Sequence, residues 1–186
     1  MGHGGNVIAE LMTDHREVEE LFGRIQALPL RDERRGPLVE QVTIELVRHS
    51  VAEEMYLYPA VREHVRDGDA LADKEIEDHG KVEGMLKDLE NIPVGDERYD
   101  SVVDRLVSEV GAHVADEEQN LFPALAGACS SQTLDTLGDQ VRRAKKIAPT
   151  RPHPSAPDNP PGNKLLAPGT GLVDRARDLI TGRGKS

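Results

Sequence analysis

Two long stretches of the chain repeat each other at an offset of 64 residues, with no insertion between the first and last matched positions. The matched pairs are Asp14-His15 with Asp78-His79, Val18-Glu19 with Val82-Glu83, His49 with His113, Glu53-Glu54 with Glu117-Glu118, Leu57 with Leu121, and Pro59-Ala60 with Pro123-Ala124. Each copy is predicted to be a helical hairpin in which one helix carries a single His and the next carries His-x-x-x-Glu. The chain is therefore expected to contain two related hairpins.

Apolar residues recur at helical spacing in four long segments and one shorter segment. The long segments span 6–28, 37–65, 71–91 and 97–126, and the shorter one spans 132–147 behind Ser131 as its N-cap. Short connections favour antiparallel neighbours, so we expect an all-α, up-down-up-down four-helix bundle with a short fifth helix. Aromatic residues make up only 3% of the chain and charged residues 31%, which suits a bundle better than a β-sandwich.

The C-terminal part differs in composition from the rest of the chain. Residues 142–186 carry ten Lys or Arg against three Asp, which leaves 13 against 31 acidic residues before them. Seven of the twelve prolines fall between Pro149 and Pro168. We therefore expect a bundle domain at 1–147, then an extended Pro-rich linker and a short basic amphipathic tail at 148–186. The tail could contact the acidic body, an anionic surface or only solvent.

Bulk properties exclude several classes of protein. The net charge of −11 argues against nucleic acid as a partner of the bundle. No run of about 18 apolar residues is present, and the N-terminus does not resemble a secretory signal, so we expect a cytoplasmic protein without a transmembrane segment. The single Cys129 excludes disulfide frameworks and thiolate metal sites. The oligomeric state is not set by any of these features.

Four histidines at matched positions indicate a metal site, because packing alone gives no reason to repeat imidazoles. Within each His-x-x-x-Glu pair the two side chains lie one helical turn apart, so they can reach a common point. The predicted ligands are His15, His49, Glu53, His79, His113 and Glu117. A metal-free helical scaffold is the alternative.

The number of ligands suits two metal ions better than one. Two octahedral ions need about twelve bonds, of which four imidazoles supply about four and two bridging carboxylates about four more. A bridging oxo or hydroxo group supplies about two, which leaves about two positions open for a small ligand. Imidazole and carboxylate donors without thiolate favour iron or manganese over copper, and other divalent metals such as zinc remain possible.

The order of these residues resembles one known family. His15, His49-Ser-Val-Ala-Glu53-Glu54, His79 and His113-Val-Ala-Asp-Glu117-Glu118-Gln-Asn-Leu121-Phe122-Pro123 are similar to the bacterial, actinobacterial-type branch of hemerythrin-like (HHE) proteins, over residues 5–126. The resemblance implies a non-haem di-iron centre with an oxo-type bridge in a four-helix bundle. It implies an activity among oxygen carriage, oxygen or iron sensing, nitric oxide handling and peroxide removal.

The chain departs from the oxygen-carrying members at Glu83. Those proteins have a fifth His four residues after the His of the third helix, where this chain has Glu83. We therefore expect reaction with a small ligand rather than reversible oxygen carriage. Glu83 is a candidate additional ligand, and an exposed helix glutamate is the alternative.

The two copies also differ at Tyr56 and Tyr58, where the second copy has Asn and Phe. Tyr56 lies on the face of His49 in an ideal helix, whereas Tyr58 would point away unless Pro59 distorts the register. Either phenol could donate a hydrogen bond to peroxide near one iron, or bind the iron. A tyrosine at the edge of the core is the alternative for each.

We therefore expect a di-iron protein that binds and reacts with a small oxygen species, either H₂O₂ in a catalase-like reaction or O₂. The second hypothesis is a non-enzymatic module that senses or stores O₂, NO or iron and contacts a partner through its basic tail. The residues alone leave the choice between enzyme and sensor open.

Overall fold

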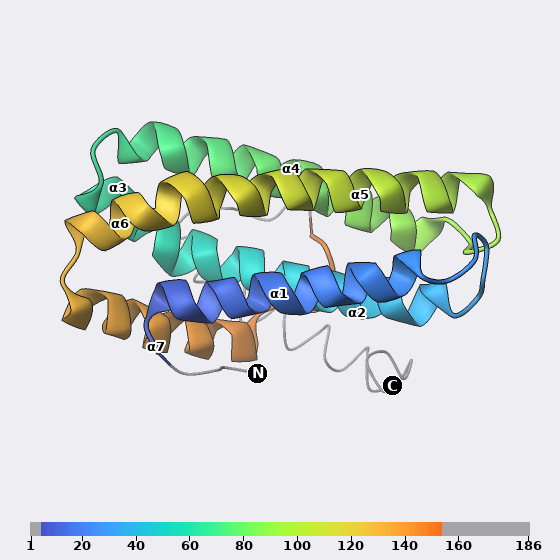
Figure 1. Cartoon of the computed structure of the whole chain (residues 1–186), viewed down its shortest axis with the longest axis horizontal. Helices are drawn as coiled ribbons and strands as arrows, with labels where there is room; N and C mark the ends of the chain where they lie inside the picture. Colours follow the sequence, from blue (N-terminus) through green and yellow to red (C-terminus); the bar gives the residue numbers. More distant parts are fainter. Residues whose placement is uncertain (1–4, 154–186) are drawn as a thin grey trace.

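In the computed structural model, which describes residues 5–153, four long helical rods lie side by side and a fifth helix packs beside them (Figure 1). The elements are α1 (Val7–Gln26), α2 (Arg35–Ala52), η1 (Glu53–Leu57), α3 (Tyr58–His64), α4 (Gly68–Asn91), α5 (Glu97–Asp116), η2 (Glu117–Leu121), α6 (Phe122–Ala128) and α7 (Ser131–Ile147). The second rod runs through α2, η1 and α3, and the fourth runs through α5, η2 and α6. This arrangement confirms the predicted all-α helical bundle with an additional fifth helix.

Several helices begin at a side chain that accepts a hydrogen bond from the first turn. Asn6 accepts from the amide of Ala9 before α1, at 3.0 Å. Before α7, the cap is Ser130, whose hydroxyl oxygen accepts from the amide of Thr133 at 3.1 Å. The prediction that Ser131 caps this helix is wrong by one residue, because Ser131 is already helical.

A five-residue π-helical turn interrupts the second and fourth rods at matching places, η1 in the first copy and η2 in the second. A proline follows each turn by two residues. Proline has no amide hydrogen and its ring crowds the carbonyl four residues earlier, so the α-helical pattern breaks there. The amide of Tyr58 donates to the carbonyl of Glu53, and that of Phe122 to Glu117, in each case five residues back. The widened turn aligns positions five residues apart on one face.

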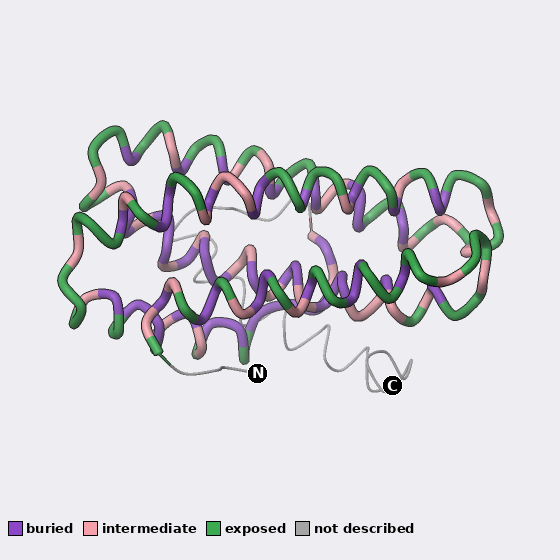
Figure 2. The backbone as a smooth tube through the Cα atoms, in the orientation of Figure 1, coloured by how far each residue is buried: buried purple, intermediate pink, exposed green. Residues whose placement is uncertain are grey.

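The interior contains two apolar clusters with a polar layer between them. One cluster gathers side chains from the α3, α6 and α7 end, including Leu11, Leu57 and Leu121. The other gathers side chains toward the α1–α2 and α4–α5 connections, including Ile25 and Val103. Along each long rod a predicted metal ligand lies where the sequence passes from one cluster to the other. Figure 2 shows the buried residues on the inward side of the rods.

None of the described helices has the length and apolarity that crossing a membrane requires. Most of the predicted linker and basic tail at 148–186 lies outside the described residues. The first residues after α7 are packed rather than solvated, with Ala148 and Thr150 buried.

Candidate metal centre

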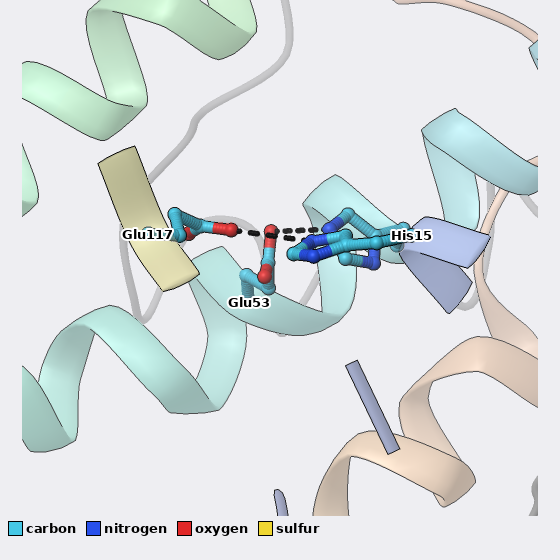
Figure 3. A group of neighbouring side chains, drawn as sticks. His15, Glu53 and Glu117 are labelled. Atoms are coloured by element: carbon cyan, nitrogen blue, oxygen red, sulfur yellow. Dashed lines mark ion pairs between the residues drawn. The ribbon is translucent and has the colours of Figure 1, made fainter. Parts of the chain in front are cut away.

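All six predicted ligands lie together in the polar layer, and each is at most 6% exposed. Three groups of side chains in the described part of the chain could each hold an ion, with ligand atoms within 4.8 Å of one another. They are His15, His49, Glu53 and Glu117; Glu53, His79 and His113; and Glu75, His113 and Glu117. Figure 3 shows Glu53 and Glu117 pointing toward His15 across the interior. The structure thus brings four rods together at a single place.

Each of the two central carboxylates faces one imidazole from each copy of the repeat. Oε2 of Glu53 lies 3.1 Å from Nε2 of His49 and 3.3 Å from Nε2 of His79. Glu117 has the same relation to the other two histidines, with Oε2 at 3.4 Å and 3.6 Å from their Nε2 atoms. A carboxylate placed between two pairs of imidazoles is suited to contact two ions at once.

Several ligand atoms of this layer are buried without a hydrogen-bond partner among the described residues. They include Nε2 of His15, Oε1 of Glu53 and Oε2 of Glu117. A buried carboxylate oxygen or imidazole nitrogen without a partner destabilises the fold. A cation at this position would satisfy all three atoms, so the residues present fit a bound metal.

A carboxylate oxygen lies close to Nδ1 of each imidazole, on the side away from the central glutamates. The pairs are His15 with Glu118 at 2.9 Å, His49 with Asp14 at 3.3 Å, His79 with Glu54 at 2.9 Å and His113 with Glu75 at 2.7 Å. Carboxylates in this position fix the tautomer and leave Nε2 free to bind a metal. Hydrogen bonds therefore orient the rings of His15, His49 and His79. His113 and Glu75 are in close ion-pair contact without a hydrogen bond among the described residues.

The role of these carboxylates is only partly visible in the sequence. Glu54 and Glu118 appear in the repeat, directly after the two central glutamates, and each reaches an imidazole of the other copy. Glu75 is fully buried, yet its counterpart in the first copy is Leu11, so the repeat gives no sign of it. Glu75 was therefore missed by sequence reasoning.

The electrostatics of the layer favour a cation. Burial disfavours the charged form of His49, but the carboxylates of Glu53 and Asp14 outweigh burial and raise its pKa to about 10. Burial also opposes the charged form of His79, and Glu53 and Glu54 raise its pKa well above the usual value. An environment that draws protons onto two buried imidazoles has an excess of negative charge, which a metal ion can compensate.

Tyr58 reaches the centre, whereas an ideal helix would have turned it away. Its side chain is fully buried, and Oη donates to Oε1 of Glu117 at 3.0 Å and lies 3.0 Å from Nε2 of His79. The π-turn η1 explains the change of face, because it aligns Tyr58 with Glu53 five residues earlier. Burial, and then the charges of Glu117 and Glu53, raise the pKa of Tyr58 well above its usual value, so the phenol keeps its proton.

The other candidates occupy different places. Tyr56 is half-buried and packs against the apolar cluster that contains Leu57. Glu83 joins no candidate ligand group in the described part of the chain, and its Oε1 accepts from the backbone amide of His153 at 2.6 Å. In the second copy, the ring that replaces Tyr58 is Phe122, which stacks on His15 at 5.7 Å between centroids.

A small cavity of about 20 Å³ adjoins the imidazoles. The four histidines line it together with apolar residues that include Val18, Leu46 and Val82. This volume is enough for roughly one water-sized molecule. The geometry thus combines a cation site with a small, largely apolar space beside it.

A four-helix bundle with paired His-x-x-x-Glu ligands defines a class of metal-binding proteins, and comparison with known families agrees. The family model described as the hemerythrin HHE cation-binding domain matches residues 6–125. The chain belongs to this family, and the predicted resemblance is confirmed. The HHE domain binds metal cations, and the His and Glu cluster provides a place for them.

Individual relatives extend this comparison. An uncharacterised hemerythrin-like protein of Schizosaccharomyces pombe is 28% identical over 171 residues, which cover 91% of this chain and 84% of that protein. A DNA nickase of Nostoc is 26% identical over 140 residues, which cover 75% of this chain but only 39% of the nickase. The crystal structure of a hemerythrin HHE cation-binding domain-containing protein from Mycobacterium kansasii has a TM-score of 0.66 at 23% identity, covering 76% of this chain and 85% of that one. The last similarity supports the fold.

Proposed function

We propose that the polar layer holds two iron ions and that the protein reacts there with a small oxygen species, foremost hydrogen peroxide. The observation that carries this proposal is the pair of ligand groups joined by Glu53. His15 and His49 would hold one ion, His79 and His113 the other, and Glu53 and Glu117 would contact both. An oxo or hydroxo bridge would complete the set.

Iron is proposed because the donors are imidazoles and carboxylates. Such donors suit iron and manganese, although other divalent metals also bind them. Bound iron would supply the electron transfer that peroxide dismutation needs, in which two molecules of H₂O₂ give two of water and one of O₂. O₂ itself is the second candidate substrate, since it also fits the small ligand class that the domain implies.

The chain's own residues would orient the substrate, limit its size and hold a proton. The small cavity beside the imidazoles selects against larger molecules, and its apolar walls disfavour bulk water. Tyr58 keeps a proton on Oη at the edge of the ligand layer, 3.0 Å from Oε1 of Glu117. A phenol in this place can donate a hydrogen bond to an oxygen atom that binds between the two halves.

A non-enzymatic module that binds O₂, NO or iron is the alternative function. The match to the Nostoc protein favours this alternative, since it covers less than half of a longer chain and so fits a domain that acts within larger proteins. In that case the centre would bind its ligand reversibly, and the protein would signal the bound state to a partner.

The test is made on protein produced in iron-supplemented medium. Elemental analysis is expected to find close to two iron ions per chain, and an oxygen electrode is expected to record O₂ after peroxide is added. His49→Ala combined with His113→Ala removes one ligand from each ion and is the matched control. Reversible spectral change with O₂ or NO but no O₂ release would favour the sensor, and wild-type metal content in the double variant would refute the site.

A further inference from the structure

The helix α7 lies outside both copies of the repeat and outside the residues that the family model matches. It packs against α1, α2 and η1, which all belong to the first copy (Figure 1). Leu134, Leu137 and Val141 bury its apolar face in the cluster next to the polar layer. The second copy has no equivalent helix among the described residues, so α7 makes the two halves of the bundle different.

One charged residue of α7 points into the protein. Lys145 is only 8% exposed, and its Nζ lies 3.0 Å from Oε1 of Glu10 and 2.5 Å from Oδ1 of Asp14. The other oxygen of Asp14 lies 3.3 Å from Nδ1 of His49. A continuous contact therefore runs from α7 through Asp14 to a predicted metal ligand.

Neutralising Glu10 is not the whole role of Lys145. Glu10 has a second cationic partner in Arg142, whose Nη1 lies 3.4 Å from Oε2. Asp14 forms ion pairs with both Lys145 and His49. Lys145 thus holds a charged carboxylate in place behind His49.

In the second copy, the carboxylate beside the imidazole is paired with an exposed lysine. Oε2 of Glu75 lies 2.7 Å from Nδ1 of His113, and Oε1 lies 3.1 Å from Nζ of Lys74, which is on the same helix as Glu75. The side chain of Lys74 is 48% exposed and also pairs with Asp116. Water screens an ion pair of this kind, whereas the pair between Lys145 and Asp14 is shielded.

We propose that Lys145 is a positioning residue of the metal centre: it fixes Asp14 against His49, and through that contact α7 controls how firmly one of the two ions is held. The inference rests on the proposed metal function. The ion at His15 and His49 depends on a buried lysine from outside the repeat. The ion at His79 and His113 depends on an exposed lysine within it, and the two ions are therefore held unequally.

The experiment titrates ferrous iron anaerobically into metal-free protein in competition with a chelator. Lys145→Met is expected to weaken one of the two ions by about 10- to 100-fold, the usual effect of removing a partner behind a ligating imidazole, and to leave the other ion unchanged. Lys145→Arg keeps the charge and is expected to restore most of the affinity. Arg143→Gln lies on the exposed side of the same helix and is the matched control.

Asp14→Asn separates positioning from packing. If Lys145 acts through Asp14, Lys145→Met has no further effect on iron affinity in the Asp14→Asn background, and that outcome supports the inference. An equal loss in both backgrounds, or two tightly held ions in folded Lys145→Met protein, overturns it. Circular dichroism of each metal-free variant reports the fold. If Lys145→Met does not fold, the decision falls to Lys145→Arg and Asp14→Asn. Weaker binding of one ion in Asp14→Asn with near wild-type binding in Lys145→Arg supports the inference, and two tightly held ions in Asp14→Asn overturn it. Wild-type protein that binds no iron would instead refute the proposed function.

Discussion

The hydroxyl oxygen of Tyr58 lies 3.0 Å from Oε1 of Glu117, so a residue of the first copy donates to a carboxylate of the second. The reverse contact does not exist, because the residue matched to Tyr58 is Phe122, which has no hydroxyl and stacks on His15. The centre therefore has one phenol, at the side of His79. The predicted ligand set is therefore nearly symmetric, but only the side of His79 has a phenol that can donate a proton.

Tyr58→Phe is expected to keep the metal and lose most of the reaction with peroxide. The substitution removes only the hydroxyl, and loss of a positioned proton donor lowers a rate by roughly 100-fold or more. Iron content and O₂ release measured on the same preparation separate the two effects. Tyr56→Phe is the control, two residues away and packed against the apolar cluster. Unchanged O₂ release in Tyr58→Phe would rule out a role for the phenol.

Glu53→Gln and Glu117→Gln are each expected to reduce the iron content by more than one ion per chain. Each carboxylate lies between imidazoles of both copies, so its loss affects both ions, whereas His49→Gln removes a ligand of only one. Elemental analysis after dialysis measures the difference. Glu20→Gln, on the exposed face of α1, is the control. Loss of a single ion in the two glutamate variants would show that the carboxylates do not bridge.

The sequence predicts which side chains meet in the polar layer, because a residue that both copies need is repeated at the same offset. His15, His49, Glu53 and their three counterparts are found in this way, and the helices that carry them follow from apolar periodicity. Residues that serve one copy only are not repeated. Glu75 and Lys145 are examples, since the fold alone places Glu75 beside His113 and Lys145 beside Asp14.

The position of Tyr58 shows a second limit. An ideal helix assigns side chains to faces by a fixed rotation per residue, and the π-turn η1 changes that rotation locally. Pro59 indicates that the helix is disturbed, but it does not say by how much or in which direction. The extra residue in the turn has to be seen in the structure before Tyr58, rather than Tyr56, can be placed beside Glu117.

The metal-free protein is expected to lose stability as the pH rises from about 6.5 to about 10. The folded state raises the pKa of His49 from 6.5 to about 10, so the stabilising contribution is complete below 6.5 and is lost as the pH rises through the folded value. Iron affinity should change in the opposite direction, because the metal needs neutral imidazoles. Thermal melts of chelator-treated protein measure the first effect, with His49→Gln as the control that should show a smaller decline. A melting temperature that is constant over this range would contradict the prediction.

Gly138→Ala is expected to destabilise the protein by about 1–3 kcal/mol, because α7 passes very close to the start of α1. A Cβ at Gly138 would lie 2.7 Å from the carbonyl oxygen of Gly5 and 3.0 Å from the backbone nitrogen of Val7, and backbone atoms cannot move aside cheaply. The melting temperature should fall by roughly 2–4 °C for each kcal/mol lost. Gly23→Ala, where nothing lies within 4 Å of the added carbon, is the control and should stabilise α1 by roughly 0.5–1 kcal/mol. Displacement of α7 also moves Lys145 away from Asp14, so Gly138→Ala should weaken iron binding, whereas Gly23→Ala should not. A destabilised Gly138→Ala protein with wild-type iron affinity would show that the packing of α7 does not affect the metal centre.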